Sequence, residues 1–178
     1  MPLPLGHAAI GLTIHDLLTR EESALQRFKL ACFTAILANL PDVDVLAGLL
    51  IAGNGNAFHR GPTHSILFAL IMGAITVGAS KLYTPIPRIG FTLSFFIILS
   101  HVVADLLFTP CSVSLLWPLE TNWSGGHSGW VDVISATLLD HEQDVGIILV
   151  CGGLITLKKW VKHRSDKPSG LPEPRKSC

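Results

Sequence analysis

The sequence predicts an all-α membrane protein, a polytopic bundle of about four to five helices with a metal site at the outward ends of the helices. Hydrophobic residues make up 49% of the 178-residue chain and charged residues only 15%, and the mean hydropathy is +0.49. These values lie outside the usual range for soluble domains. In addition, the apolar residues fall into long runs separated by short polar segments, which is typical of spanning helices.

Five apolar runs are expected to be helical. The first covers about residues 6–18 and is followed by the polar stretch TREESALQRFK. The second extends from Leu30 to Ala52 and is interrupted by LPDVD, and the others cover 66–79, 89–108 and about 145–157. A helix needs ~20 residues to cross a hydrocarbon core of ~30 Å, so the first and last helices are short and either tilt little or cross only in part.

The chain is expected to form one membrane-embedded helical domain, residues 1–160, followed by a basic tail, residues 161–178. The composition of the tail, rich in charge and proline, is typical of disorder. The N-terminus has no basic region ahead of its apolar residues, so we expect it to belong to the folded protein. The four cysteines show no CxxC spacing and indicate neither a zinc ribbon nor a disulfide framework.

The distribution of basic residues predicts the orientation in the membrane. Lys and Arg concentrate after the first helix, between the third and fourth helices, and in the tail, and cytoplasmic loops carry such an excess. We therefore expect a multi-pass inner (plasma) membrane protein with a cytoplasmic C-terminus, in which segments 53–64 and 110–144 face outward. The formal net charge of zero gives no indication of nucleic acid as a partner.

Ionisable side chains from four separate segments are predicted to meet on the outward side. These candidates are His7, Asp42, Asp44, His59, His64, His101 and Asp105. His101 and Asp105 are four residues apart, so on a helix they share one face, about 6 Å apart along the axis. The sequence therefore predicts a cluster of His and Asp side chains rather than isolated polar positions.

The two polar motifs are suited to deliver such side chains. In LPDVD, Pro41 disrupts the helix, which lets Asp42 and Asp44 face the same cavity. In HRGPTHS, the Gly-Pro turn can bring His59 back over His64. Thr63 is the expected N-cap of the following helix.

The energy of buried charge indicates a bound cation. A charged side chain near the bilayer centre costs about 2.5 to 3.5 kcal/mol, and Arg60 is the only basic residue on the outward side. His with Asp is a ligand set that favours zinc, with manganese or iron as alternatives, over calcium or magnesium. Seven candidates exceed the three protein ligands of a usual catalytic zinc, so either two ions share them or some only support the ligands.

The same residues have simpler structural explanations. The His and Asp residues can be satisfied polar groups of a helix bundle, and His7 can be interfacial. Asp44 can cap the next helical turn. Arg60 can either form a salt bridge to Asp42 or Asp44, or clamp an oxyanion or phosphate.

The order of the motifs resembles a known family. An early His followed by Gly (His7, Gly11), then LPDVD, HRGPTHS and HVVAD, is similar to the membrane-bound metal-dependent hydrolases, known as LexA-binding and inner membrane-associated. The resemblance covers about residues 1–118, with a more distant similarity to zinc-dependent phospholipase C, an all-helical protein. It implies the following ligand roles: metal ligands at His7, Asp42, His59, His64, His101 and Asp105, with Asp44 as ligand or base.

The expected function is therefore a membrane-bound metal-dependent hydrolase that uses metal-activated water on a phosphoester or lipid-linked substrate, with one or two ions and with Asp44 and Arg60 as catalytic residues. The expected partners are the lipid bilayer, a small-molecule or lipid substrate and a protein at the cytoplasmic tail. The alternatives are a regulatory or scaffold protein with a structural metal and, less favoured, a metal or proton transporter. The 119–144 loop, which contains WSGGHSGW, is expected to be either a substrate lid or a connector.

Overall fold

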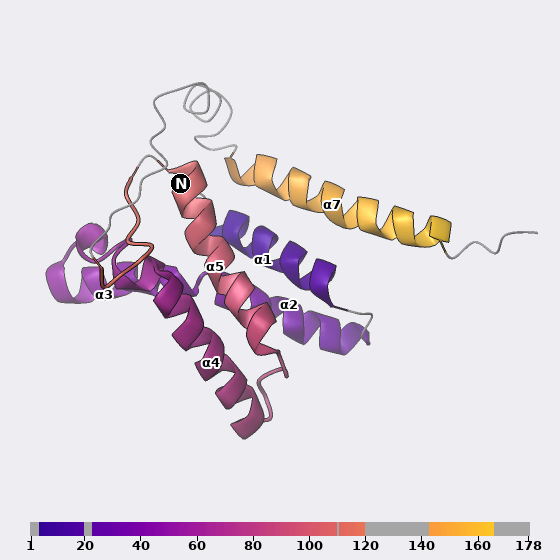
Figure 1. Cartoon of the computed structure of the whole chain (residues 1–178), viewed down its shortest axis with the longest axis horizontal. Helices are drawn as coiled ribbons and strands as arrows, with labels where there is room; N and C mark the ends of the chain where they lie inside the picture. Colours follow the sequence, from indigo (N-terminus) through magenta and orange to yellow (C-terminus); the bar gives the residue numbers. More distant parts are fainter. Residues whose placement is uncertain (1–3, 20–22, 110, 120–142, 166–178) are drawn as a thin grey trace, which may run out of the picture.

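The computed structural model describes residues 4–19, 23–109, 111–119 and 143–165, and within them the protein is all-α, as predicted (Figure 1). The described residues form six α-helices rather than four to five, because the second apolar run is divided in two. The helices are α1 (Pro4–Leu18), α2 (Ala24–Ala38), α3 (Val43–Ala52), α4 (Ile66–Leu82), α5 (Phe91–Phe108) and α7 (Gln143–Ser165). Three short 3-10 helices connect some of them: η1 (Leu40–Asp42), η2 (Gly55–Ala57) and η3 (Pro62–His64).

Helix α2 begins earlier than the apolar run from Leu30 predicts. A capping box at Ser23 and Gln26 explains the difference: the Ser23 hydroxyl accepts from the Gln26 backbone N–H, and the Gln26 side chain accepts from the Ser23 N–H. Two of the otherwise unpaired N–H groups at the helix start are satisfied in this way. The polar stretch that the hydropathy pattern assigns to a connection is therefore partly the first turns of α2.

The LPDVD motif interrupts the helix between α2 and α3, as predicted. Pro41 lies in η1, where it has no N–H to donate, and the two flanking helices are bent by 50° relative to each other. Helix α3 ends at Gly53, whose positive φ of 65° forms the left-handed cap that glycine adopts without strain. The break places Asp42 and Asp44 at the start of α3 instead of on opposite faces of one long helix.

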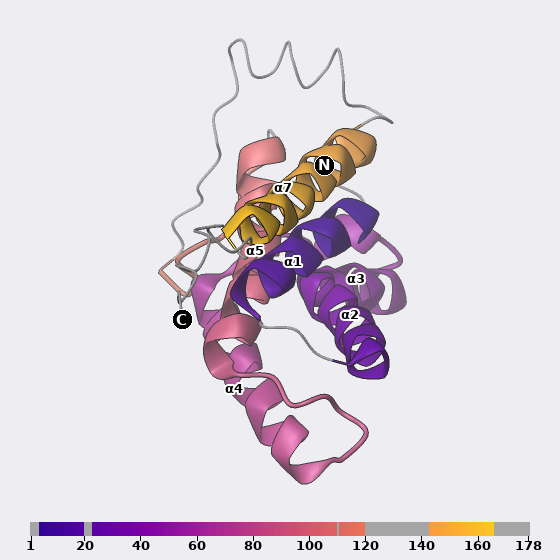
Figure 2. The same cartoon turned by 90° about the vertical axis from the view of Figure 1, so that its right-hand side faces the viewer.

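Helix α5 lies at the centre of the bundle and packs against α1, α2 and α4, and α1 in turn packs against α2 and α7. Figures 1 and 2 show α5 between α4 and α1, with α7 alongside α1. The buried core joins these helices through Leu37, Ala38, Ala69, Ile97 and Ile98. The central helix thus has a fixed position, and it carries His101 and Asp105 on its buried side.

Within the described residues, one helix is long and apolar enough to cross a membrane, α5, or two spans exist if the bent pair α2–α3 counts as one. Helix α4 is apolar but shorter. Large apolar side chains are nonetheless exposed on several helices, with Leu50 87% and Leu82 88% exposed, which suits contact with lipid. The multi-pass arrangement remains a prediction.

Helix α7 extends beyond the predicted run of 145–157 and takes in the basic residues up to Arg164. Residues 161–165, which we expected to begin the tail, are therefore helical. The boundary between domain and tail stays a prediction, because residues 166–178 lie outside the described part of the chain. Most of the 119–144 loop, with WSGGHSGW, also lies outside it.

The close approach of α1 to α2 yields the first prediction. A Cβ on Gly11 would lie 2.7 Å from Cβ of Ala38 and 3.4 Å from Cγ2 of Ile97. We expect Gly11→Ala to lower the free energy of unfolding by about 1 to 3 kcal/mol, because the helices must move apart. Thermal unfolding in detergent, followed by circular dichroism, measures the effect.

Gly78→Ala is the matched control, because a Cβ at Gly78 of α4 meets no atom within 4 Å. It should leave the stability unchanged or raise it by up to about 1 kcal/mol, given the better helix propensity of alanine. Equal destabilisation by both substitutions would contradict the close packing of α1 on α2.

Candidate metal centre

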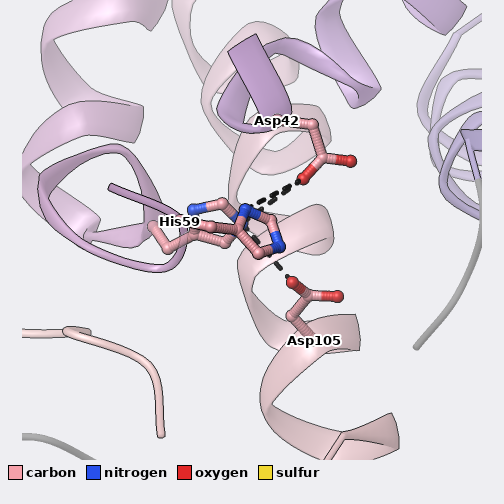
Figure 3. A group of neighbouring side chains, drawn as sticks. Asp42, His59 and Asp105 are labelled. Carbon is pink, nitrogen blue, oxygen red and sulfur yellow. Dashed lines mark ion pairs between the residues drawn. The ribbon is translucent and has the colours of Figure 1, made fainter. Parts of the chain in front are cut away.

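The structure brings all eight predicted site residues together at one end of the bundle. They come from four elements and one turn: His7 from α1, Asp42 from η1, Asp44 from α3, His59, Arg60 and His64 from the 59–64 turn, and His101 and Asp105 from α5. Figure 3 shows the carboxylates of Asp42 and Asp105 on either side of histidine side chains, with His59 beside them. Segments separated by up to about a hundred residues thus form one cluster.

Most of the cluster is shielded from solvent. His7, His64, His101 and Asp105 are each at most 1% exposed. Asp42 differs, because 19% of its side chain is exposed. The cluster therefore has one side that solvent can reach, and Asp42 lies on that side.

The geometry contains two groups of potential ligands. One group consists of Asp42, His59, His64 and Asp105, and the other of His7, His101 and Asp105, with the ligand atoms of each group within 4.8 Å of one another. Asp105 belongs to both groups. Its two oxygens face different histidines: Oδ1 lies 3.5 Å from Nε2 of His7, and Oδ2 lies 3.4 Å from Nε2 of His64. A carboxylate placed in this way can bridge two ions.

His101 has a fixed tautomer. Its Nδ1 lies 2.7 Å from the backbone oxygen of Ala38, and because a carbonyl can only accept, Nδ1 carries the proton. In the neutral ring, Nε2 is then an unprotonated donor for a metal, and it faces Asp42 Oδ1 at 3.2 Å. Metal-binding histidines commonly have such a backbone partner on the other ring nitrogen.

Asp44 holds two further histidines in orientation. Its Oδ1 lies 3.0 Å from Nδ1 of His59, and its Oδ2 lies 3.2 Å from Nδ1 of His64. Thr63 donates a hydrogen bond to the same Oδ2. With both oxygens used in this way, Asp44 is placed to position histidines, which favours that role over the expected ligand or base.

His64 carries a proton that a cation would have to displace. Its Nε2 lies 3.3 Å from Nε2 of His101, and two unprotonated nitrogens at this distance would repel each other. Burial alone would lower the pKa of His64, but the three surrounding carboxylates outweigh that penalty and raise the pKa to about 10. Either a proton or a metal ion therefore has to lie at this nitrogen, and metal binding releases the proton.

Several buried atoms of the cluster are suited to bind a cation. Among the described residues, His7 Nε2, Asp42 Oδ1, His59 Nε2 and both carboxylate oxygens of Asp105 are buried and make no hydrogen bond. Such groups are costly in an apolar interior unless a partner satisfies them. Imidazole nitrogens and carboxylate oxygens are the donors that zinc, manganese and iron accept. The residues present thus fit a transition-metal site.

Arg60 occupies a special backbone position beside the cluster. Its φ of 65° is positive, a conformation that non-glycine residues rarely adopt. The Ser114 N–H donates to the Arg60 carbonyl, and the Ile66 N–H donates to that of Leu115, so the segment after α5 fixes the turn. The Arg60 Nε lies 3.7 Å from Asp105 Oδ2. Among the described carboxylates, Arg60 thus pairs with Asp105 and not with Asp42 or Asp44, the two partners of the alternative salt bridge.

Two roles in the HRGPTHS turn differ from those predicted. Ser65 caps α4 by accepting from the Phe68 N–H, and Thr63, the expected cap, instead binds Asp44. The sequence contains no signal for Ala38 or for residues 113–115, because the contacts described between them and the site are made by backbone groups, whatever the side chain. A role for Thr63 other than the helix cap could have been suspected, because Ser65, two positions later, is an equally good N-cap for α4.

The role of Asp44 yields the second prediction. Asp44→Asn replaces one accepting oxygen with an NH₂ group that faces a histidine N–H, so the affinity for zinc should fall by about 10- to 100-fold. The number of ions bound at saturation should stay the same. Competition with a chromophoric chelator measures both quantities.

Asp16→Asn is the control for this substitution, because Asp16 lies on α1 about 13 Å along the helix axis from His7 and should leave the affinity unchanged. If Asp44→Asn instead lowers the number of ions bound, Asp44 is a ligand. Unchanged affinity would show that Asp44 does not position the histidines.

Comparisons with known proteins agree with the motifs. A family model described as "YdjM inner membrane protein" matches residues 1–164. Inner membrane protein YbcI of Escherichia coli (strain K12) is 35% identical over 121 residues, which cover 66% of this chain and 68% of that protein. No solved structure matches. The chain therefore belongs to the YdjM family of inner membrane proteins, the LexA-regulated family of membrane-bound metal-dependent hydrolases that its motifs resemble.

Proposed function

We propose that this protein is a membrane-bound hydrolase that uses one or two divalent transition-metal ions to cleave a phosphoester or lipid-linked substrate. The observation that carries the proposal is the convergence of six potential ligands with unsatisfied buried atoms, open to solvent at Asp42. A catalytic metal needs an accessible coordination position, whereas a structural one is fully enclosed. The family to which the chain belongs supports the same reading.

The two ligand groups suggest how ions would be held. His7, His101 and Asp105 would bind one ion, and Asp42, His59, His64 and Asp105 would bind another. Zinc is our first choice, with manganese or iron as alternatives. When bound, such an ion lowers the pKa of a coordinated water toward 7 and polarises a phosphoryl oxygen.

The charge of the occupied site would favour an anionic substrate. Two divalent ions exceed the charge of the three aspartates by one unit, and Arg60 adds another positive charge. The Arg60 side chain is 12% exposed, so its guanidinium can reach a ligand from the open side. We assign it to stabilising the charge that develops on a phosphoryl oxygen.

Asp42 is the residue best placed to accept a proton from the attacking water. One of its oxygens is buried against His64 and His101, and its side chain reaches the open side. Asp44, the expected ligand or base, has both oxygens engaged by Thr63 and two histidines. Its contribution is to orient those histidines, and for His64 this leaves Nε2 facing Asp42 and Asp105.

A substrate with an apolar part is favoured by the surface next to the centre. Helix α3 begins immediately after Asp42 and exposes Leu46, Leu50 and Ile51 by 59%, 87% and 75%. Such a surface suits lipid, so a lipid-linked head group can approach Asp42 along α3. Together with the positive-inside rule, this surface supports our proposal that the centre lies at the outward ends of the helices and the C-terminus in the cytoplasm.

Hydrolysis by the metal-loaded protein is the third prediction. Detergent-purified protein supplied with zinc or manganese should hydrolyse a chromogenic phosphodiester or a lipid phosphate. Asp42→Asn should lower kcat by at least about 100-fold, because the proton acceptor is lost. Asp16→Asn, an aspartate away from the cluster, should leave kcat unchanged. Activity that survives Asp42→Asn would contradict the proposed role.

A regulatory or scaffold protein with a structural metal is the alternative, and the near-complete burial of His7, His64, His101 and Asp105 favours it. In that case the cytoplasmic tail would bind a protein partner. Stoichiometric metal with no hydrolysis of either substrate would support this alternative, because a fully enclosed metal has no position for water.

A further inference from the structure

A cleft lies at the other end of α1, away from the metal centre. Helices α1, α2 and α7 enclose a cleft of about 830 Å³, lined by four basic side chains, Arg27, Lys158, Lys159 and Lys162. The C-terminal ends of α1 and α7 and the start of α2 lie together on the side of the molecule away from α3 (Figure 1). None of these basic residues belongs to the site described above.

Among the described side chains that line the cleft, basic residues outnumber acidic ones. Asp16 is the one acidic residue of this described lining, and its carboxylate lies 3.1 Å from Lys158 Nζ, which also donates to the Asp16 carbonyl. This contact ties α7 to α1 and uses the negative charge of Asp16. Arg27 comes from α2 and Lys159 from α7, so cations from different helices face one space. A cleft of this kind attracts an anion.

Part of the lining is apolar, which distinguishes the cleft from a site for a free anion. Leu12, Ala31 and Ile155 contribute apolar walls, and the polar side chains of His15 and Thr19 complete the lining. A basic rim above an apolar wall matches an amphiphile with a negatively charged head and a hydrocarbon chain. Basic pockets between membrane helices commonly bind anionic lipid head groups in this way.

Trp160 indicates that this end of α7 lies at the level of lipid head groups. Its side chain is 51% exposed, and the Arg164 guanidinium lies over its ring at 3.9 Å. Tryptophan and basic residues together are typical of the membrane-water interface. The positive-inside rule predicts that this interface is the cytoplasmic one.

We propose that the cleft between α1, α2 and α7 binds the phosphate head group of an anionic phospholipid, with Arg27 and Lys159 contacting the phosphate and the acyl chain lying along Leu12 and Ile155. This inference does not depend on hydrolysis at the metal centre. The bound lipid would link α7 to the rest of the bundle at the cytoplasmic end.

Native mass spectrometry of the full-length protein in detergent tests the proposal, with phosphatidylglycerol as the probe. We expect one tightly held phosphatidylglycerol and weaker binding of phosphatidylcholine. The double variant Arg27→Gln, Lys159→Gln should weaken binding by about 30-fold, given the usual contribution of each basic residue near an anionic lipid. Inorganic phosphate should not displace the lipid, because it lacks the apolar part.

Lys81→Gln, Arg88→Gln is the matched control: it removes two exposed basic residues on the same predicted side, Lys81 in the last turn of α4 and Arg88 between α4 and α5, and should leave binding unchanged. In the wild type, raising the salt from about 0.1 to 0.5 M should weaken binding, because exposed charges are screened; this arm needs no variant. Equal losses in both double variants, salt-independent binding, equal affinity for phosphatidylcholine, or displacement by inorganic phosphate would each overturn the proposal.

Discussion

Three aspartate carboxylates in an apolar bundle have to be matched by positive charge, and the organisation of this protein follows from that requirement. Asp42, Asp44 and Asp105 each contact histidines, and Asp105 also contacts Arg60. Because a buried charge without a partner is costly, the four elements and one turn that supply these groups have to converge. The break at LPDVD and the positive φ at Arg60 are local costs that this convergence compensates.

The imidazole nitrogens and carboxylate oxygens without a hydrogen-bond partner in the described part of the chain connect the fold with the proposed binding of metal. Backbone and carboxylate partners occupy Nδ1 of His59, His64 and His101, and the Nε2 atoms of His64 and His101 face the carboxylates of Asp42 and Asp105. Pairing among protein groups alone leaves both oxygens of Asp105 without a hydrogen bond in the described part of the chain. A divalent cation would satisfy the nitrogens and the oxygens together.

Much of this could be predicted from the sequence, because the relevant motifs are local. The four-residue spacing of His101 and Asp105, the helix break at Pro41 and the Gly-Pro turn before His64 each follow from backbone rules. The support of the ligands could not be predicted. Ala38 acts through its carbonyl, Thr63 binds a residue 19 positions away, and the pairing of Arg60 with Asp105 joins a turn to a helix 45 residues later. These contacts depend on tertiary packing, which a single sequence does not specify. The early start of α2 was not predicted for a different reason. The expected bound at Leu30 follows the hydropathy pattern, whereas the capping box at Ser23 sets the actual start of the helix.

Elemental analysis of the detergent-purified protein, prepared without chelator, is the most direct test of the metal centre. The wild type should contain about one or two tightly held transition-metal ions per chain, in line with one or two ligand groups. His64→Ala and His101→Ala should each lose metal, while His163→Ala, on the exposed end of α7, should retain it. A wild-type protein that contains no metal, and takes up none on reconstitution with zinc, manganese or iron, would contradict the account.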